Sequence, residues 1–354
     1  MEILRKIAGQ TRKRLMGLRS LAGQARARLL AMSVTQRVQL AYTLVLLLLL
    51  LPIYHFWGNT QDIERFGRSA WGWLQNRWSG SGGDFSHGWL IPWISLFFIW
   101  RARAELWDSP KRRSLLGLLL IVAGLALHWV GYRAQLVRLS LLSVIVLFFS
   151  IPFYVYGAEV ARRLLFPCAY LFFCIPLSFL KDISFPLRLF ATRVGCGILN
   201  TFGLTVVRHG TRIFQATISA SGARTVLEHG FKFEVADPCS GLRSLVAMLA
   251  LAAAYAHVSQ RGLIRKWTLF LGGIPLAIAG NIARIITIFI VAAVFGQQAA
   301  IDIYHDWSGF ILFAVAILLM IGFGRLLNMP YREVLAKWKK KLFTPSSLPL
   351  DSSV

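Results

Sequence analysis

The stretch Ala236–Leu245 holds the residues with the clearest chemical potential, where a polar, strand-like segment meets a long apolar run. Asp237 is suited to be a helix N-cap, and Pro238 to the first helical position, where its missing N–H costs nothing. Cys239 would then lie in the first helical turn, whose partial positive charge favours a thiolate over a thiol. Arg243, one turn later, acts in the same direction, and Asp237 acts weakly against it. The simpler alternative is a small cysteine that only packs at a helix end.

A second candidate group lies inside a later apolar run, about 267–295. Arg284 stands about 25 Å along a helix from the start of that run. A charged side chain at such a depth in a bilayer is expensive, and it is a functional candidate by default. Asn281 lies one turn earlier and shares its helical face. The alternative is a structural ion pair between Arg284 and Asp302 or Asp237.

A histidine completes the set. His305 comes just before the last apolar run, and a lone histidine beside Trp307 is also typical of a membrane interface. A thiolate attacks an acyl carbon, an imidazole carries the proton to the leaving amine, and a fixed cation stabilises the oxyanion. Three other histidines lie on the same side in the topology predicted below and compete as the base: His87, His209 and His229.

The composition defines the class of protein that must position these groups. The chain has 354 residues, of which 56% are hydrophobic, and its mean hydropathy is +0.59. Several apolar runs approach the ~20 residues that cross a bilayer, so we predict an all-α polytopic membrane protein. The net charge of +24 would suggest nucleic acid in a soluble protein, but the positive-inside rule explains it here, and no nucleic-acid partner is expected. The four cysteines lack metal-type spacing, so we expect no metal site and no disulfide framework. The sequence has no nucleotide-binding Gly-rich loop, and we expect no organic cofactor.

We predict about eight transmembrane helices. Their ranges are about 39–56, 88–101, 114–131, 139–157, 164–180, 239–257, 267–295 and 307–325. The second is short for a crossing. The seventh is long and has weak points at Gly272-Gly273, Pro275 and Gly280. Splitting it in two would place the Lys339–Lys341 tail outside, against the positive-inside rule, so we keep it as one long or broken helix.

Charge predicts the orientation. With the N-terminus in the cytoplasm, the inner segments hold 25 of the 39 Lys/Arg and six of the 15 acids. These segments are 1–38, 101–113, 158–163, 259–266 and 324–354. The arrangement follows the positive-inside rule and places one large segment, about 181–238, on the outer side.

Three regions follow from this topology: a basic segment at 1–38, a membrane-embedded domain at 39–325 and a basic cytoplasmic tail at 326–354. The first carries nine Lys/Arg against one acid. It fits an amphipathic helix on an anionic membrane surface, a mitochondrial transit peptide or a solvated tail. In the outer segment, Ser184–Phe202 mixes Pro186, Arg188 and Arg193 with apolar residues and is interpreted as an interfacial or re-entrant helix. Alternation of period two in Arg212–Ser219 and Phe231–Val235 predicts short strands, which would form a small sheet on the outer face.

The ordered set of motifs resembles the exosortase/archaeosortase family. It consists of Cys-Ser-Gly-Leu-Arg-Ser at 239–244, Asn-x-x-Arg at 281–284 and a histidine before the last span. Phe-Ser-His-Gly-Trp-Leu-Ile-Pro at 85–92 is similar to that family's N-terminal region. The resemblance covers about 85–325, and the basic segment 1–38 is not part of it.

The resemblance implies a membrane cysteine transpeptidase or protease on the outer side of a bacterial cytoplasmic membrane. Its protein substrates would carry a C-terminal sorting signal: a short motif such as Pro-Glu-Pro, an apolar helix and a basic end. The resemblance assigns the catalytic roles to Cys239, Arg284 and His305. From their positions we expect Arg243, one turn after Cys239, and Asn281, on the face of Arg284, to be supporting residues.

Two other functions stay open at this point. In a non-catalytic assembly factor for exopolysaccharide export, the polar outer face would bind glycan or a lipid carrier, and Cys239 would only pack. A transporter is less favoured, because the charged residues cluster at one face and leave little trace of a path across. A low pKa of an externally accessible Cys239 would favour catalysis.

Overall fold

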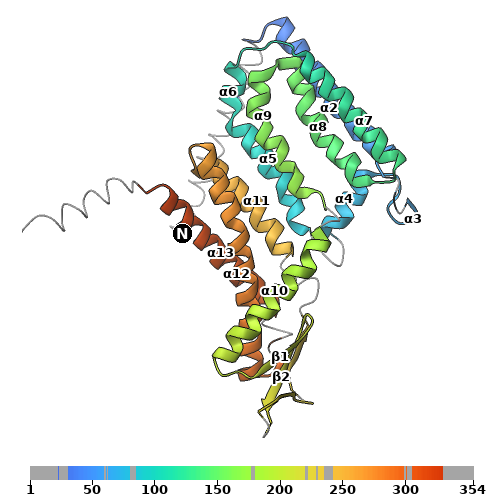
Figure 1. Cartoon of the computed structure of the whole chain (residues 1–354). Helices are drawn as coiled ribbons and strands as arrows, with labels where there is room; N and C mark the ends of the chain where they lie inside the picture. Colours follow the sequence, from blue (N-terminus) through green and yellow to red (C-terminus); the bar gives the residue numbers. More distant parts are fainter. Residues whose placement is uncertain are drawn as a thin grey trace, which may run out of the picture. The chain divides into compact units, whose positions relative to one another are not determined.

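The computed structural model describes residues 23, 31–59, 61, 63–79, 85–176, 180–219, 222–228, 230–234, 242–298, 300 and 305–329. It is mostly helical, with a small antiparallel sheet (Figure 1). The chain forms two compact units. The first unit comprises 1–79 and 92–175, and the second comprises 80–91 and 176–354. Residues 85–91 therefore belong to the second unit, although Ser79 before this stretch and Pro92 after it belong to the first.

Five helices are long and apolar enough to cross a membrane. They are α2 (Val34–Phe56), α7 (Leu115–Arg133), α8 (Val137–Tyr156), α12 (Leu263–Phe295) and Trp307–Leu327 of α13 (His305–Leu327). These five confirm the polytopic helical class. The other predicted crossings fall on α5 (Leu90–Arg101), α9 (Ala158–Tyr170) and α11 (Leu242–Ser259), whose described apolar stretches are shorter. The count of eight stays a prediction.

Helix α2 begins five residues before the predicted start at 39, because a capping box initiates it. The Oγ of Ser33 accepts a hydrogen bond from the backbone N–H of Gln36 (3.2 Å), and the Gln36 side chain accepts one from the N–H of Ser33 (3.1 Å). This reciprocal pair satisfies two backbone donors that a helix start leaves open. Two short helices follow in the first unit, α3 (Ile63–Phe66) and α4 (Ala70–Ser79).

Helices α7 and α8 form the centre of the first unit, and α2 packs beside α8 (Figure 1). Gly117, Gly124 and Gly131 recur every seven residues on α7 and face α8. A Cβ on Gly117 would lie 2.4 Å from the backbone N of Tyr154, so only glycine permits this approach of the two backbones. A hydrogen bond between the hydroxyls of Tyr54 and Ser143 ties α2 to α8.

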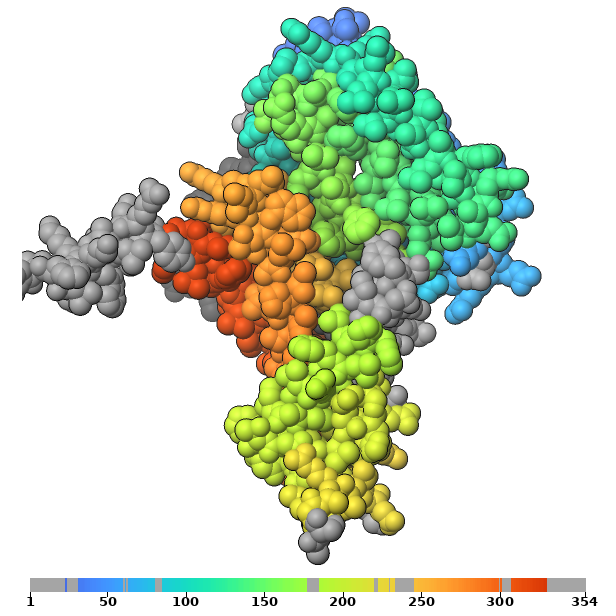
Figure 2. Space-filling model, viewed as in Figure 1, coloured from blue at the N-terminus to red at the C-terminus, as the bar shows by residue number. Residues whose placement is uncertain are grey.

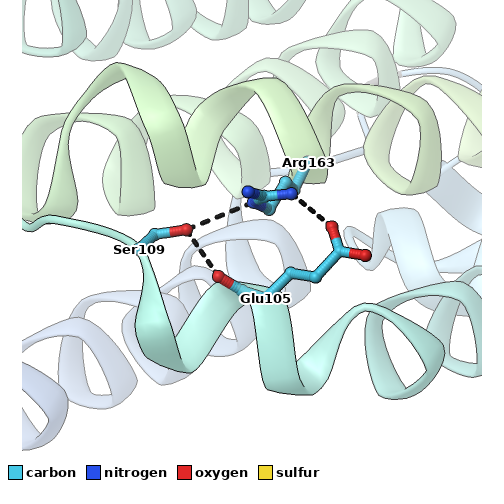
Figure 3. Close-up of polar contacts among 3 residues, drawn as sticks. All are labelled: Glu105, Ser109 and Arg163. Carbon is cyan, nitrogen blue, oxygen red and sulfur yellow. Dashed lines mark hydrogen bonds and ion pairs between the residues drawn. The ribbon is translucent and has the colours of Figure 1, made fainter.

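Helix α9 begins at Ala158, six residues before the predicted span at 164, because Gly157 with φ +88° ends α8 there. It continues as the 3-10 helix η2 (Leu171–Cys174). Arg163 of α9 donates to Glu105 of α6 (Arg103–Asp108) and to the Oγ of Ser109 at 3.2 Å (Figure 3). These contacts join α6 and α9 near the surface of the first unit.

The second unit contains α10 (Leu180–Thr201) and four strands: β1 (Val206–His209), β2 (Arg212–Ile218), β3 (Arg224–Val226) and β4 (Lys232–Glu234). All pairings are antiparallel, and β2 is central. The backbone N of Gln215 bonds toward β4 and that of Ala216 toward β1. Successive amides of a strand point to opposite edges, so β1 pairs with one edge of β2 and β4 with the other. Strand β3 pairs with a different part of the same edge as β4, and the sheet is therefore three strands wide. The helix and strands predicted in this segment are confirmed, and their placement at the outer face of a membrane stays a prediction.

Helix α12 is the centre of the second unit. It is one continuous helix of 33 residues with Pro275 inside it, so of the two predicted alternatives, one long or one broken helix, the structure has the long one. Helices α10, α11 and α13 pack against it. The sheet contributes Ile213 and Phe231 to a shared core with Ile285 and Phe289 of α12, and the rings of Phe231 and Phe289 are 5.0 Å apart. The strands lie at the surface beside α10 (Figure 2).

Candidate functional site

Arg284 lies on α12 and is half-buried against α13. Its Nε donates a hydrogen bond of 3.1 Å to the Oγ of Ser308, which is completely buried. Gly309 forms the adjacent surface, where an added Cβ would stand 3.7 Å from Nη2 of Arg284. The guanidinium therefore rests on the turn of α13 that contains Ser308 and Gly309.

His305 is the first residue of α13, and its side chain lies outside the described part of the structure. It precedes Ser308 by three residues, so the two positions share one face of the helix, about one turn apart. Arg284 contacts the turn that follows His305. Arg284 on α12 thus contacts α13 one turn after the position of His305.

Asn281 is buried on α12, one turn before Arg284. Ile285, the residue after Arg284, is buried in the core that joins α12 to α10 and the sheet. The turn 281–285 is therefore held from two sides, by α13 through Arg284 and by the sheet-bearing core through Ile285. Such fixation limits the movement of the guanidinium.

Cys239 lies outside the described residues, together with the predicted cap, Asp237-Pro238. Helix α11 begins at Leu242, three residues after Cys239 in the sequence, and packs along α12. Arg243 falls in the first turn of α11, although its side chain is not described. The described helix thus begins later than the predicted start at 239.

The three other cysteines, which packing alone explains, are buried: Cys168, Cys174 and Cys196. Burial raises the pKa of the Cys196 thiol to about 11, and the positive charge of Arg208 only partly offsets this. A thiol with such a pKa is protonated at neutral pH and is a weak nucleophile. These three sites have the character of packing residues.

The competing histidines occupy different surroundings. His87 lies in the 3-10 helix η1 (Ser86–Trp89) of the second unit, half-buried, with its ring 5.5 Å from that of Phe85. His209 is exposed at the end of β1, with its ring edge-on to Phe214. His229 lies outside the described residues. The choice of His305 as the base therefore stays a prediction.

Within the described residues, no group of three or more His, Cys, Asp or Glu side chains is arranged to hold a metal ion. The structure brings together a guanidinium on α12 and a hydroxyl on α13, and the Asn281 amide lies one turn before Arg284 on α12. That set suits the binding and stabilisation of an oxygen-centred negative charge.

The fold defines a multi-pass helical membrane protein with a polar cluster between α12 and α13. The family described as Transmembrane exosortase (Exosortase_EpsH) matches residues 73–322. Since the match spans more than half of the chain, the protein belongs to the transmembrane exosortase family, as the motifs predicted. No curated protein and no solved structure matches the chain.

The matched region contains every candidate site residue and leaves out the basic segments at both ends. Membership in this family implies a transpeptidase that processes proteins with PEP-CTERM-type sorting signals, and its members are generally cysteine transpeptidases.

Proposed function

We propose that this protein cleaves a C-terminal sorting signal through a thioester on Cys239, on the outer face of the bacterial cytoplasmic membrane. Arg284 stabilises the oxyanion, and His305 is the general acid and base. The substrates are membrane-anchored proteins destined for sorting to the surface or into exopolysaccharide. No metal or organic cofactor takes part in these steps.

The contact between Arg284 and Ser308 is the observation that carries this proposal. It brings the guanidinium of α12 to the turn of α13 that follows His305. A half-buried cation inside an apolar helix is costly, and a developing negative charge in the reaction would give it a function. Cys239 precedes α11, which packs on the same helix α12.

In the first half of the reaction, the Cys239 thiolate attacks the carbonyl carbon of the scissile peptide bond, and the carbonyl oxygen becomes an oxyanion beside Arg284. The C–N bond then breaks as the His305 imidazolium gives its proton to the leaving amine. The leaving fragment consists of the apolar helix and basic tail of the sorting signal. The rest of the substrate stays attached to Cys239 as a thioester.

In the second half, an amine or water attacks the thioester, neutral His305 removes its proton, and the Cys239 thiolate leaves. An amine gives transpeptidation and water gives hydrolysis. Arg243, one turn after Cys239, stabilises the thiolate by its charge. Asn281 supplies a further hydrogen-bond donor on the face of Arg284. The substrate's apolar helix packs laterally on the spans, with its basic tail in the cytoplasm.

The test uses a reporter: an exported protein domain followed by Pro-Glu-Pro, an apolar helix of about 20 residues and a Lys/Arg tail. Wild-type protein should shorten this sorting reporter, and hydroxylamine should release the enzyme-bound intermediate as a hydroxamate of the reporter. Cys239→Ala should abolish both while the protein still accumulates in the membrane. Cys196→Ala is the matched control, because this thiol is buried and protonated. Processing at the wild-type rate in Cys239→Ala would refute the proposal.

A further inference from the structure

We infer that Ser308 is a positioning residue that orients Arg284 for the reaction, an inference that rests on the proposed function. The Oγ of Ser308 accepts the Nε–H of Arg284 at 3.1 Å. Ser308 is completely buried (0 %), so packing fixes its hydroxyl in one place. Its role is to hold Arg284, and not to contact the substrate.

The bond at Nε determines which part of Arg284 meets the substrate. A guanidinium is planar and carries five N–H donors in a rigid fork. Anchoring the single Nε–H on Ser308 fixes the plane of the group at its stem. The four N–H donors of Nη1 and Nη2 lie at the far end of the fork, where they suit an oxyanion. Gly309 lies beside this end. A Cβ added to Gly309 would stand 3.7 Å from Nη2 of Arg284, which is an ordinary contact distance.

Ser308 also links the orientation of Arg284 to the helix that carries His305. The serine and the histidine are one turn apart on α13, so a guanidinium anchored on Ser308 keeps a constant distance from the start of that helix. A catalytic cation acts in the transition state only when it is held close to its productive geometry. A loosened Arg284 would still be charged but would be misaligned.

Two variants of Ser308 test this inference with the sorting reporter. Ser308→Ala removes the hydroxyl, and Ser308→Cys keeps nearly the same volume with a weak acceptor. We expect both to lower kcat about tenfold to a hundredfold, the range for losing a hydrogen bond to a charged group. KM should stay within about twofold, because the lost interaction matters in the transition state and not in substrate binding.

Ser150→Ala is the matched control. Ser150 on α8 is also completely buried, and among the described residues its Oγ has no hydrogen-bond partner. Deleting this hydroxyl should leave kcat and KM unchanged. If Ser308→Ala does not accumulate as folded protein, Ser308→Cys decides the question alone.

The positioning role of Ser308 and the proposed function fail in different ways. Wild-type kcat in the folded Ser308 variants, with an inactive Cys239→Ala, would overturn the positioning inference and leave the proposed function intact. A rise in KM that matches the loss in kcat would also overturn it and assign Ser308 to substrate binding or packing. Processing that survives in Cys239→Ala would refute the proposed function itself.

Discussion

The two compact units use their polar residues differently. In the first unit, two neutral hydrogen bonds join apolar helices: Tyr54 bonds Ser143, and Ser95 donates to the carbonyl of Pro167 at 2.7 Å. Its ion pair between Arg163 and Glu105 lies at the surface, with side chains 35% and 66% exposed. In the second unit, by contrast, the half-buried Arg284 stands well inside α12, the longest of the described helices.

This difference distinguishes polar groups that join helices from a polar group that we propose to act in the reaction. Neutral hydrogen bonds and small residues are sufficient to join apolar helices. A cation within an apolar helix is costly, and we propose that the reaction gives Arg284 its function. The first unit therefore has the character of a helical scaffold, and the second unit carries the candidate site.

The largest effect is expected at Arg284. Arg284→Lys should lower processing of the sorting reporter by about a hundredfold or more, because an ammonium cannot reproduce the planar, multi-donor fork at an oxyanion. Arg163→Lys in the first unit is the control and should retain nearly full activity, since exposed ion pairs contribute only about 0–1 kcal/mol. Equal losses in the two variants would remove the distinction between the units.

The next largest effect concerns the scaffold. Gly117→Ala should reduce the stability of the first unit by about 1–3 kcal/mol, the usual cost of overpacking, because the new Cβ would stand 2.4 Å from the backbone N of Tyr154. Gly322→Ala on α13 is the matched control, with no atom within 4 Å of its added Cβ. Thermal unfolding in nanodiscs measures both. Unchanged stability in Gly117→Ala would mean that α7 and α8 are not so closely packed.

A smaller effect is expected at Arg243. Arg243→Lys keeps the positive charge one turn after Cys239, so processing should fall by only a few-fold if the residue acts through charge alone. The comparison with Arg284→Lys is the informative measurement. A loss at Arg243 that equals or exceeds the loss at Arg284 would place the oxyanion partner on α11 instead of α12.

The sequence predicted the fold where a local pattern determines it. Apolar runs located the five long helices, and alternation located β2 and β4. It missed α4, because Ala70–Ser79 mixes tryptophans with polar residues and has no long apolar run. It placed the start of α2 too late, because Ser33 and Gln36 form a capping box ahead of the apolar run. Local capping, not hydropathy, decides that boundary.

The site was only partly predictable for a related reason. Arg284 and Asn281 stand out in the sequence as polar residues within an apolar run. Ser308 carries no such signal, since serines are common in membrane helices and its partner lies on another helix, 24 residues earlier. The packing of α12 on α13 brings these two residues together, and tertiary packing is not encoded in a local motif.

The most direct test of the central claim is the pH dependence of Cys239 alkylation, measured with a membrane-impermeant reagent. Free imidazole titrates near pH ~6.5 and free thiol near ~8.5, so a Cys–His pair is a thiolate and an imidazolium near neutrality. Cys196, with a pKa of about 11, should contribute little signal between pH 6 and 9.

We predict that His305→Ala suppresses alkylation of Cys239 at about pH 6 and that the difference shrinks toward about pH 9, where the free thiol also ionises. His87→Ala, His209→Ala and His229→Ala should leave the profile unchanged. An unchanged profile in His305→Ala, with a shift in one of those three variants, would contradict the account and place the base outside α13.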